Sequence, residues 1–204
     1  MSLTVNANPT SSISPIPEGT YLGVCNMLVD LGVQYNETYK SSSRKVLIGW
    51  EIPEETFTVD GEEKPRVLSK RYTASLDERA TLRQDLAAWR GHDFTPEELA
   101  AFDLRNIVGA SCLINVIHKE SNGKTYANIS SIMALPKGMK KGTLSEPATV
   151  FDLDSCTLSD IDNLPKWIAE IVKKSQTYEE KMAAPAKIEE FVDELNEDEG
   201  GLPF

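Results

Sequence analysis

The sequence has few cysteines, and none of them are paired at metal-ligand spacing. Its 204 residues contain three, Cys25, Cys112 and Cys156, an odd number without a Cys-x-x-Cys pair. This pattern argues against a disulfide framework and against a zinc site. Isolated cysteines of this kind usually serve as small buried hydrophobic side chains in proteins of a reducing compartment. We therefore expect no metal and no cofactor.

Long apolar runs are also lacking. No stretch of about 18 apolar residues is present, so no membrane-spanning helix is predicted. The N-terminus carries no charged segment followed by an apolar one, which is the pattern of a secretion signal. These absences favour a cytoplasmic protein without a membrane partner.

Catalytic motifs are missing as well. The chain has only two histidines, His92 and His118, and neither a Gly-x-Ser-x-Gly nor a Gly-x-x-x-x-Gly-Lys sequence. A nucleophile with its base, a ligand cluster or a phosphate loop would be the usual sign of an active site. We predict a binding protein, and an enzyme of nucleic-acid metabolism is the least favoured class.

The negative charge is concentrated in the C-terminal third. The net charge of −11 divides into 16 Lys and Arg against 17 Asp and Glu in residues 1–142, and 5 against 15 in residues 143–204. A nearly neutral body with clustered basic residues is able to bind a polyanion, whereas a uniformly acidic surface would repel it.

The hydrophobic periodicity predicts one domain with appendages. Residues 1–18 are rich in Ser, Thr, Asn and Pro and favour a flexible arm. The domain spans residues 19–142, followed by a loop and an amphipathic helix packing on the core at 143–178 and a disordered acidic tail at 179–204. Strands are predicted at 21–33, 44–52, 66–73, 111–118 and 124–135. Helices are predicted at 76–90, capped by Ser75, at 96–102, capped by Thr95, and from 159 or 160 to 174.

Three strands, a helix and two strands form the element order of an OB-fold. That fold is a five-stranded, partly open Greek-key barrel with a helix between strands 3 and 4, and it binds oligonucleotides or oligosaccharides. The fold class is thus mainly β with helices, although an α+β sandwich of other topology fits the same order. Fold alone does not establish function.

Basic and aromatic residues lie together at several places. Such pairs favour single-stranded nucleic acid, because phosphates need a positive groove and bases stack on aromatic rings. The candidate contacts are Arg44 and Lys45, which lead into Trp50; Lys70 and Arg71 beside Tyr72; Lys124 and Tyr126 on one strand face; and Lys137, Lys140 and Lys141 in a loop. Alternation with Val46 and Ile48 favours a core position for Trp50. For Tyr72 and Tyr126, core and stacking roles both stay open.

The C-terminal tail combines acidic residues with an apolar tip. Seven acidic and no basic residues lie between 189 and 204, among them Glu197, Asp198 and Glu199, and the chain closes with Leu202, Pro203 and Phe204. An acidic terminus that only aids solubility is one interpretation. The apolar tip favours another, a peptide ligand that docks into the pocket of a partner protein.

Two stretches resemble known proteins. The segment from Leu82 to Gly138 resembles a group of small bacteriophage replication-region proteins regarded as single-stranded DNA-binding proteins. The resemblance is carried by Trp89-Arg90-Gly91, Phe94-Thr95-Pro96-Glu97-Glu98-Leu99, Phe102-Asp103-Leu104, Cys112-Leu113, Gly123-Lys124-x-Tyr126-Ala127 and Leu135-Pro136-Lys137-Gly138. The tail is similar to the C-terminal peptide of bacterial and phage single-strand binding proteins, although Gly200 and Gly201 here separate the acids from the tip.

The resemblance implies a protein that protects single-stranded DNA in the phage-infected host. It further implies that the tail recruits replication or recombination proteins such as a helicase, polymerase, primase or recombinase. A phage adaptor or inhibitor that binds a protein and no DNA is the alternative. The sequence leaves the oligomeric state open, including a homodimer.

Overall fold

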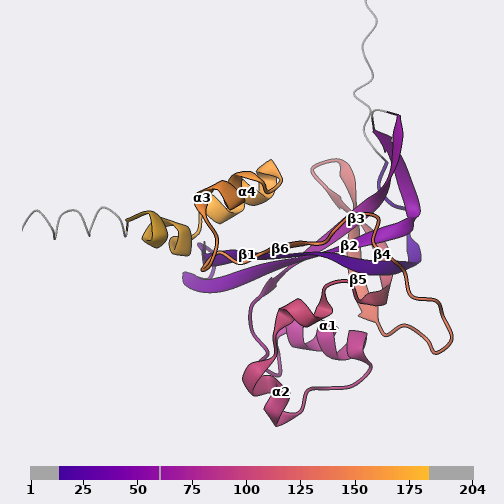
Figure 1. The fold of residues 1–204 in the computed structure, drawn as a ribbon, viewed down its shortest axis with the longest axis horizontal. Coiled ribbons are helices and arrows are strands. Elements are labelled where there is room, and N and C mark those ends of the chain that lie inside the picture. Colours follow the sequence, from indigo (N-terminus) through magenta and orange to yellow (C-terminus); the bar gives the residue numbers. More distant parts are fainter. Residues whose placement is uncertain (1–13, 60, 184–204) are drawn as a thin grey trace, which may run out of the picture.

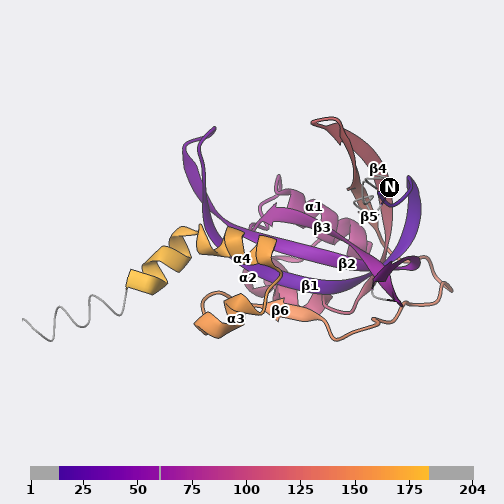
Figure 2. The ribbon, with the colours of Figure 1, turned by 90° about the horizontal axis from the view of Figure 1, so that it is seen from above.

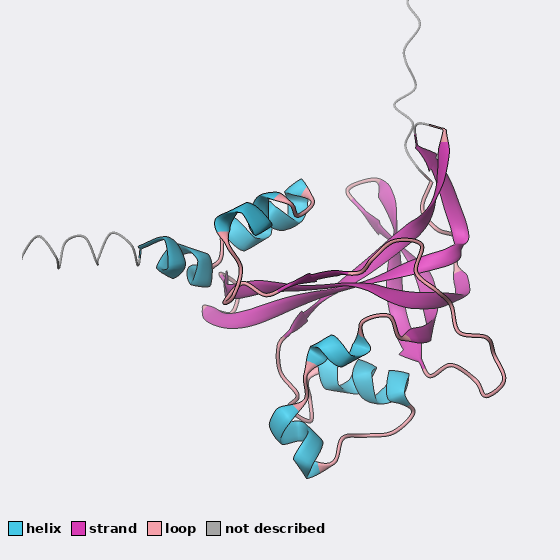
Figure 3. Ribbon diagram, in the orientation of Figure 1, coloured by secondary structure: helices cyan, strands magenta, loops and turns pink. Residues whose placement is uncertain are grey.

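The computed structural model describes residues 14–59 and 61–183. Its strands form one curled sheet, and helices lie on both faces of it (Figure 1). Strand residues dominate the central part of the chain, while helices follow the third strand and the last strand (Figure 3). The fold is mainly β, as the sequence predicted.

The first strand, β1 (Gly19–Asn36), lies at the centre of the sheet and pairs with a strand on each of its sides. Its pairing with the next strand shifts register between Cys25 and Met27 and again between Asp30 and Gly32. Gly32 has a φ of +70°, which residues with a Cβ rarely adopt. The predicted bend of this strand is therefore present, and it allows one strand to serve two parts of the sheet.

The sheet runs in the order β3-β2-β1-β4-β5, with all neighbours antiparallel. β2 spans Ser41–Val59, β3 Glu62–Thr73, β4 Ser111–Ser121 and β5 Lys124–Met133. A short strand, β6 (Thr149–Phe151), pairs in parallel with β1 beyond the end of β4. The five antiparallel strands curl into a half-barrel whose edge strands are β3 and β5.

The hairpin between β4 and β5 forms where the Asn-Gly pair predicted it. Asn122 and Gly123 have φ values of +51° and +70°. Positive φ at both central residues is the requirement of the tight hairpin turn that suits twisted strands. This turn pairs Ser121 with Lys124 and thereby fixes the register of the two strands.

Helices α1 (Thr81–Arg90) and α2 (Pro96–Ala101) cover one face of the sheet, together with the short 3-10 helix η1 (Leu104–Ile107). The buried side of α1 presents Leu82, Leu86 and Trp89 to strand residues such as Ile48 and Trp50. The rings of Trp50 and Trp89 lie 5.8 Å apart. This apolar contact packs α1 against the inner face of the half-barrel.

The opposite face of β1 and β2 carries a second core. Helices α3 (Leu158–Asp162) and α4 (Lys166–Lys173) pack there with β6. Leu31 and Leu47 of the sheet meet Leu153, Ile161 and Ile168. The predicted C-terminal amphipathic helix does pack on the domain, but Pro165 divides it into two short helices because proline lacks the N–H that an uninterrupted helix needs.

Three expectations at element ends differ from the structure. Ser75 does not cap α1; its hydroxyl bonds Asp77 instead, and the helix begins at Thr81. Serine that bonds its near neighbours favours such a turn over a helix start. Ile16, assigned to the flexible arm, is buried in the core, and residues 176–183, which reach into the predicted tail, are helical.

Candidate nucleic-acid interface

A groove lies between the two edge strands of the half-barrel. It has a volume of about 960 Å³ and is lined by residues 65–68 of β3, residues 124–127 of β5, Phe57 and residues 14–16. Lys124 and Tyr126 thus stand opposite Arg66 and Val67. Tyr126 is 48% exposed and Val67 45% exposed. The groove combines exposed aromatic and apolar surface with positive charge.

A second groove follows the first along β3. It has a volume of about 650 Å³ and is lined by basic and hydroxyl side chains, including Lys45, Lys70, Arg71, Thr73 and Arg79. Because β3 supplies residues 65–68 to the first groove and residues 70–73 to the second, one edge strand connects them. We call this edge, with its two grooves, the β3 track.

Tyr72 is buried, which removes it as a stacking platform. Its side chain is only 3% exposed, and its hydroxyl donates a 2.7 Å hydrogen bond to Asp85 of α1. Burial, reinforced by the Asp85 carboxylate, raises the pKa of Tyr72. The sequence left core and stacking open for this residue, and its position beneath α1 decides for the core.

Lys70 belongs to the same cluster. Its ammonium lies 2.6 Å from Asp85 and 5.2 Å from the centre of the Tyr72 ring. The carboxylate neutralises the charge that was expected to meet a phosphate. Lys70 lines the second groove but is held by α1, whereas Arg71, one residue on, points to the other side of the strand and is exposed.

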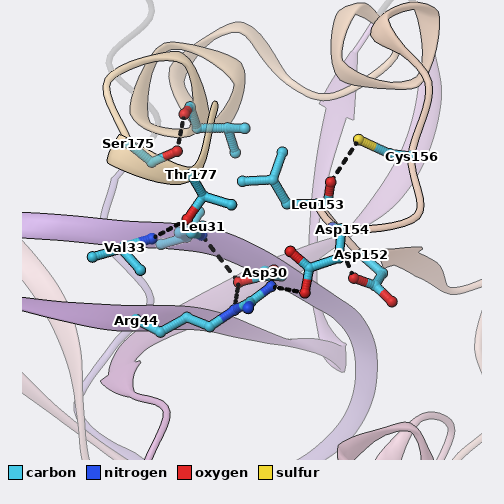
Figure 4. A network of polar contacts seen from close by, with 12 residues as sticks. Asp30, Leu31, Val33, Arg44, Asp152, Leu153, Asp154, Cys156, Ser175 and Thr177 are labelled. Atoms are coloured by element: carbon cyan, nitrogen blue, oxygen red, sulfur yellow. Dashed lines mark hydrogen bonds and ion pairs between the residues drawn. The ribbon is translucent and has the colours of Figure 1, made fainter. Parts of the chain in front are cut away.

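Arg44 is also engaged within the protein. Its guanidinium donates to Asp30 on β1 and to Asp154, which follows β6 (Figure 4). These two partners raise its pKa, and the largest cause is the hydrogen bond that Arg44 donates to Asp30. Asp30, Asp152 and Asp154 come close enough together to hold a cation, but the Arg44 side chain already lies among them. The arrangement joins β2 to the C-terminal layer and is unsuited to binding a phosphate.

Trp50 is a core residue, as the alternation predicted. Its side chain is 0% exposed and packs against Trp89. Lys45, which precedes it, stays at the surface and donates a 2.7 Å hydrogen bond to the Thr73 hydroxyl across the β2–β3 pair. Of the first predicted cluster, Lys45 lines the second groove, and Arg44 and Trp50 line neither of the two grooves.

The loop lysines lie apart from both grooves. Lys137, Lys140 and Lys141 are exposed on the connection between β5 and β6. No ion pair holds any of them within the part of the chain that the structure describes. They present free positive charge at a separate place on the surface.

The β1–β2 hairpin supplies surface aromatics that sequence reasoning missed. Tyr35 is 55% exposed and Tyr39, at the turn, is 79% exposed. In Figure 2 this hairpin and the β4–β5 hairpin rise from the same side of the sheet. No strand was predicted between residues 33 and 44, yet Tyr35 and Tyr39 near Lys40 are a signal of the same kind as Lys124 with Tyr126.

The two histidines have structural contacts. The Nε2 atom of His118 lies 2.8 Å from the carbonyl oxygen of Ile16, and Nδ1 of His92 lies 3.0 Å from that of Asp93.

The tail residues Glu197, Asp198, Glu199, Leu202, Pro203 and Phe204 lie outside the described residues, so their role stays a prediction.

Comparisons with known proteins do not place the chain in a family. No protein-family model matches the sequence, and no curated protein is significantly similar to it. Among the helices of residues 14–183, none is both long enough and apolar enough to cross a membrane.

Proposed function

We propose that this chain is a single-stranded DNA-binding protein with an OB-fold core, which binds the strand along the β3 track largely independently of base sequence. The half-barrel order β3-β2-β1-β4-β5 supports this fold, because its two edge strands are those that face each other in a partly open barrel. The helices between β3 and β4 stand where that fold has its helix.

The observation that carries the proposal is the pair of grooves that share strand β3. Lys124 and Tyr126, chosen from sequence for their spacing, lie in one groove with Arg66, and Lys45 and Arg71 lie in the next. From residue 65 to residue 73 the strand covers about 27 Å at the usual rise per residue. OB-fold sites hold about 4–16 nucleotides, and a track of this length suits the lower end of that range.

The chemistry of the track fits a nucleic-acid strand. Lysine and arginine side chains neutralise phosphates and release counterions, so the affinity should fall as salt rises. Tyr126 offers an exposed ring for a base, worth about 1–3 kcal/mol of binding free energy. Tyr35 and Tyr39 extend the aromatic surface beyond the second groove, on the hairpin next to Lys45. Base stacking and phosphate contacts do not distinguish sequences, hence the broad specificity proposed.

The tail supplies the second half of the proposed function. Its acidic residues would attract it to basic partners, and the Leu202-Pro203-Phe204 tip would fill an apolar pocket of a replication or recombination protein. DNA bound by the core and a partner bound by the tail would then be held on one molecule in the phage-infected host cell.

Titration of a fluorescently labelled oligo-dT tests the proposal. The double variant K124A/Y126A should bind about 5–150-fold more weakly, the range expected for one stacked base. K166A/W167A is the matched control, because Trp167 is 49% exposed and Tyr126 48% exposed while each pair loses one lysine and one aromatic ring. The control residues begin α4, outside both grooves.

Two results would reject the proposal. One is an absence of salt-dependent binding by the wild-type protein at low ionic strength. The other is an equal loss of affinity in the two double variants at unchanged thermal stability, which would show that the β3 track has no special role.

A further inference from the structure

A strap formed by residues 142–146 crosses three strands on the outside of the sheet. It begins at Gly142, which packs against β1 so closely that a Cβ at this position would lie 2.4 Å from the Val24 side chain. Ser145 then binds Glu51 on β2, and Glu146 lies 3.7 Å from Lys64 on β3. The strap thus runs across the sheet toward the β3 wall of the first groove.

The strand register explains this path. Val24 pairs with Glu51, and Glu51 pairs with Val67, so the three side chains form a row across β1, β2 and β3. Val67 lines the first groove. Glu51 therefore holds the strap on β2, the strand next to the one that forms a wall of the first groove.

Glu51 is the one Asp, Glu, Lys or Arg that is buried among the described residues, with 4% of its surface exposed. Its carboxylate accepts a 3.0 Å hydrogen bond from the backbone N–H of Ser145 and a 2.9 Å hydrogen bond from the Ser145 hydroxyl. None of the ion pairs in the described part of the chain includes it. All its polar contacts recorded in the structure are therefore with the strap.

Burial of a carboxylate on a strand costs free energy, because the charged group loses its hydration. An apolar side chain would pack there without losing hydration, as Val24 does on the neighbouring strand. What the carboxylate adds is direction, because two hydrogen bonds to one residue determine where the strap lies. Loss of Glu51 leaves the Ser145 N–H without this partner.

The strap immediately follows the loop lysines. Lys141 is the residue before Gly142, whose N–H donates a 3.1 Å hydrogen bond to the Ser111 hydroxyl of β4. The loop that carries Lys137, Lys140 and Lys141 is thus tethered at the end of β5 on one side and at the strap on the other. A tethered loop loses less conformational freedom on binding than a free one.

From these contacts we propose that Glu51 is a positioning residue, which clasps the strap through Ser145 and so holds Lys137, Lys140 and Lys141 ready for the phosphates of a bound strand. This inference rests on the function proposed above. It assigns the lysine loop a contact site of its own, next to the place where the strap meets β1 and β4. The strand would meet the loop after leaving the track.

Salt dependence of oligo-dT binding tests the positioning role. The variant K137A/K140A/K141A should reduce the slope of log affinity against log salt by about 2, since each phosphate contact in a single strand contributes about 0.7. E51A should produce most of the same reduction and should add nothing further in the triple-lysine background. E54A is the matched control, because Glu54 is an exposed glutamate on the same strand.

Hydrogen exchange of the strap, measured without DNA, tests the clasp separately. Backbone amides of residues 142–146 should exchange faster in E51A than in the wild type and in E54A. S145A keeps the backbone N–H bond and should show a smaller increase, so it serves if E51A folds poorly.

The outcomes separate the two proposals. Unchanged exchange in E51A and S145A overturns the clasp. Faster exchange with a wild-type salt slope overturns the positioning role. If wild-type protein fails to bind oligo-dT, the proposed function and the role of the loop in it fail together, and the exchange data alone then decide whether Glu51 holds the strap.

Discussion

Replacing Asp85 with alanine should weaken the fold and strengthen DNA binding at once. Asp85 accepts the Tyr72 hydroxyl at 2.7 Å and lies 2.6 Å from the Lys70 ammonium. The substitution leaves the buried hydroxyl without this partner and releases Lys70, which lines the second groove. One side chain therefore links the stability of the half-barrel to the charge of the β3 track.

The expected magnitudes follow from the geometry. The Lys70 and Asp85 side chains are 24% and 18% exposed, so their pair is largely shielded from water. A hydrogen bond to a charged group contributes about 1.5–3 kcal/mol, and a buried unpaired hydroxyl costs about 1–3 kcal/mol. Because Lys70 regains hydration, we expect a net loss of about 3 kcal/mol in the free energy of unfolding. In a domain of this size that lowers Tm by about 6–12 °C.

The DNA side of the prediction is measured by the salt slope. A released Lys70 adds about one phosphate contact, which steepens the slope of log affinity against log salt by about 0.7. D77A is the control, because Asp77 lines the same groove and its loss removes one negative charge without freeing Lys70. Unchanged Tm in D85A would refute the structural role of the cluster, and a slope equal to that of D77A would refute the role of Lys70.

Three further predictions address the other charged groups and the tail. R44M should lower Tm and leave the salt slope of oligo-dT binding unchanged, because Arg44 forms an ion pair with Asp30 and lines neither groove of the β3 track. A reduced slope would contradict this. The hydrogen bond from Arg83 lowers the pKa of Asp93, so its stabilising effect is present above the ordinary carboxylate pKa and is lost as pH falls through the lowered value. NMR titration should show this Asp93 pKa rising in R83M, and an unchanged pKa would count against the pair. Deletion of Phe204 should abolish capture of a replication partner from host lysate while oligo-dT affinity stays the same. Retained capture would rule out the tip as the segment that binds the partner.

The local pattern predicted much of the secondary structure for clear physical reasons. Apolar runs and alternation indicated all five main strands, and the Thr95-Pro96 pair predicted the start of α2, where Thr95 is the N-cap as expected. The three-residue β6 was missed because a strand so short has no period to detect, and its pairing with β1 depends on residues more than a hundred positions away.

The site was predictable only where its residues are close in sequence. Lys124 and Tyr126 share a face because strand side chains alternate, and both line the first groove. Arg66 comes into that groove from another strand, which no local pattern indicates. Lys70 and Tyr72 also share a face of their strand, but α1 covers that side of β3 with Asp85.

The sequence by itself determined the five main strands and their order, the acidic character of the C-terminal third and the basic and aromatic pairs, since each depends on spacing or composition. Tertiary structure alone decided which of those pairs meet solvent. Arg44 and Lys70 are held by carboxylates from other elements, while Lys124 and Tyr126 stay exposed at an edge. Burial and ion pairing depend on contacts between distant segments, and the same residue type is therefore a structural partner in one place and an exposed candidate contact in another.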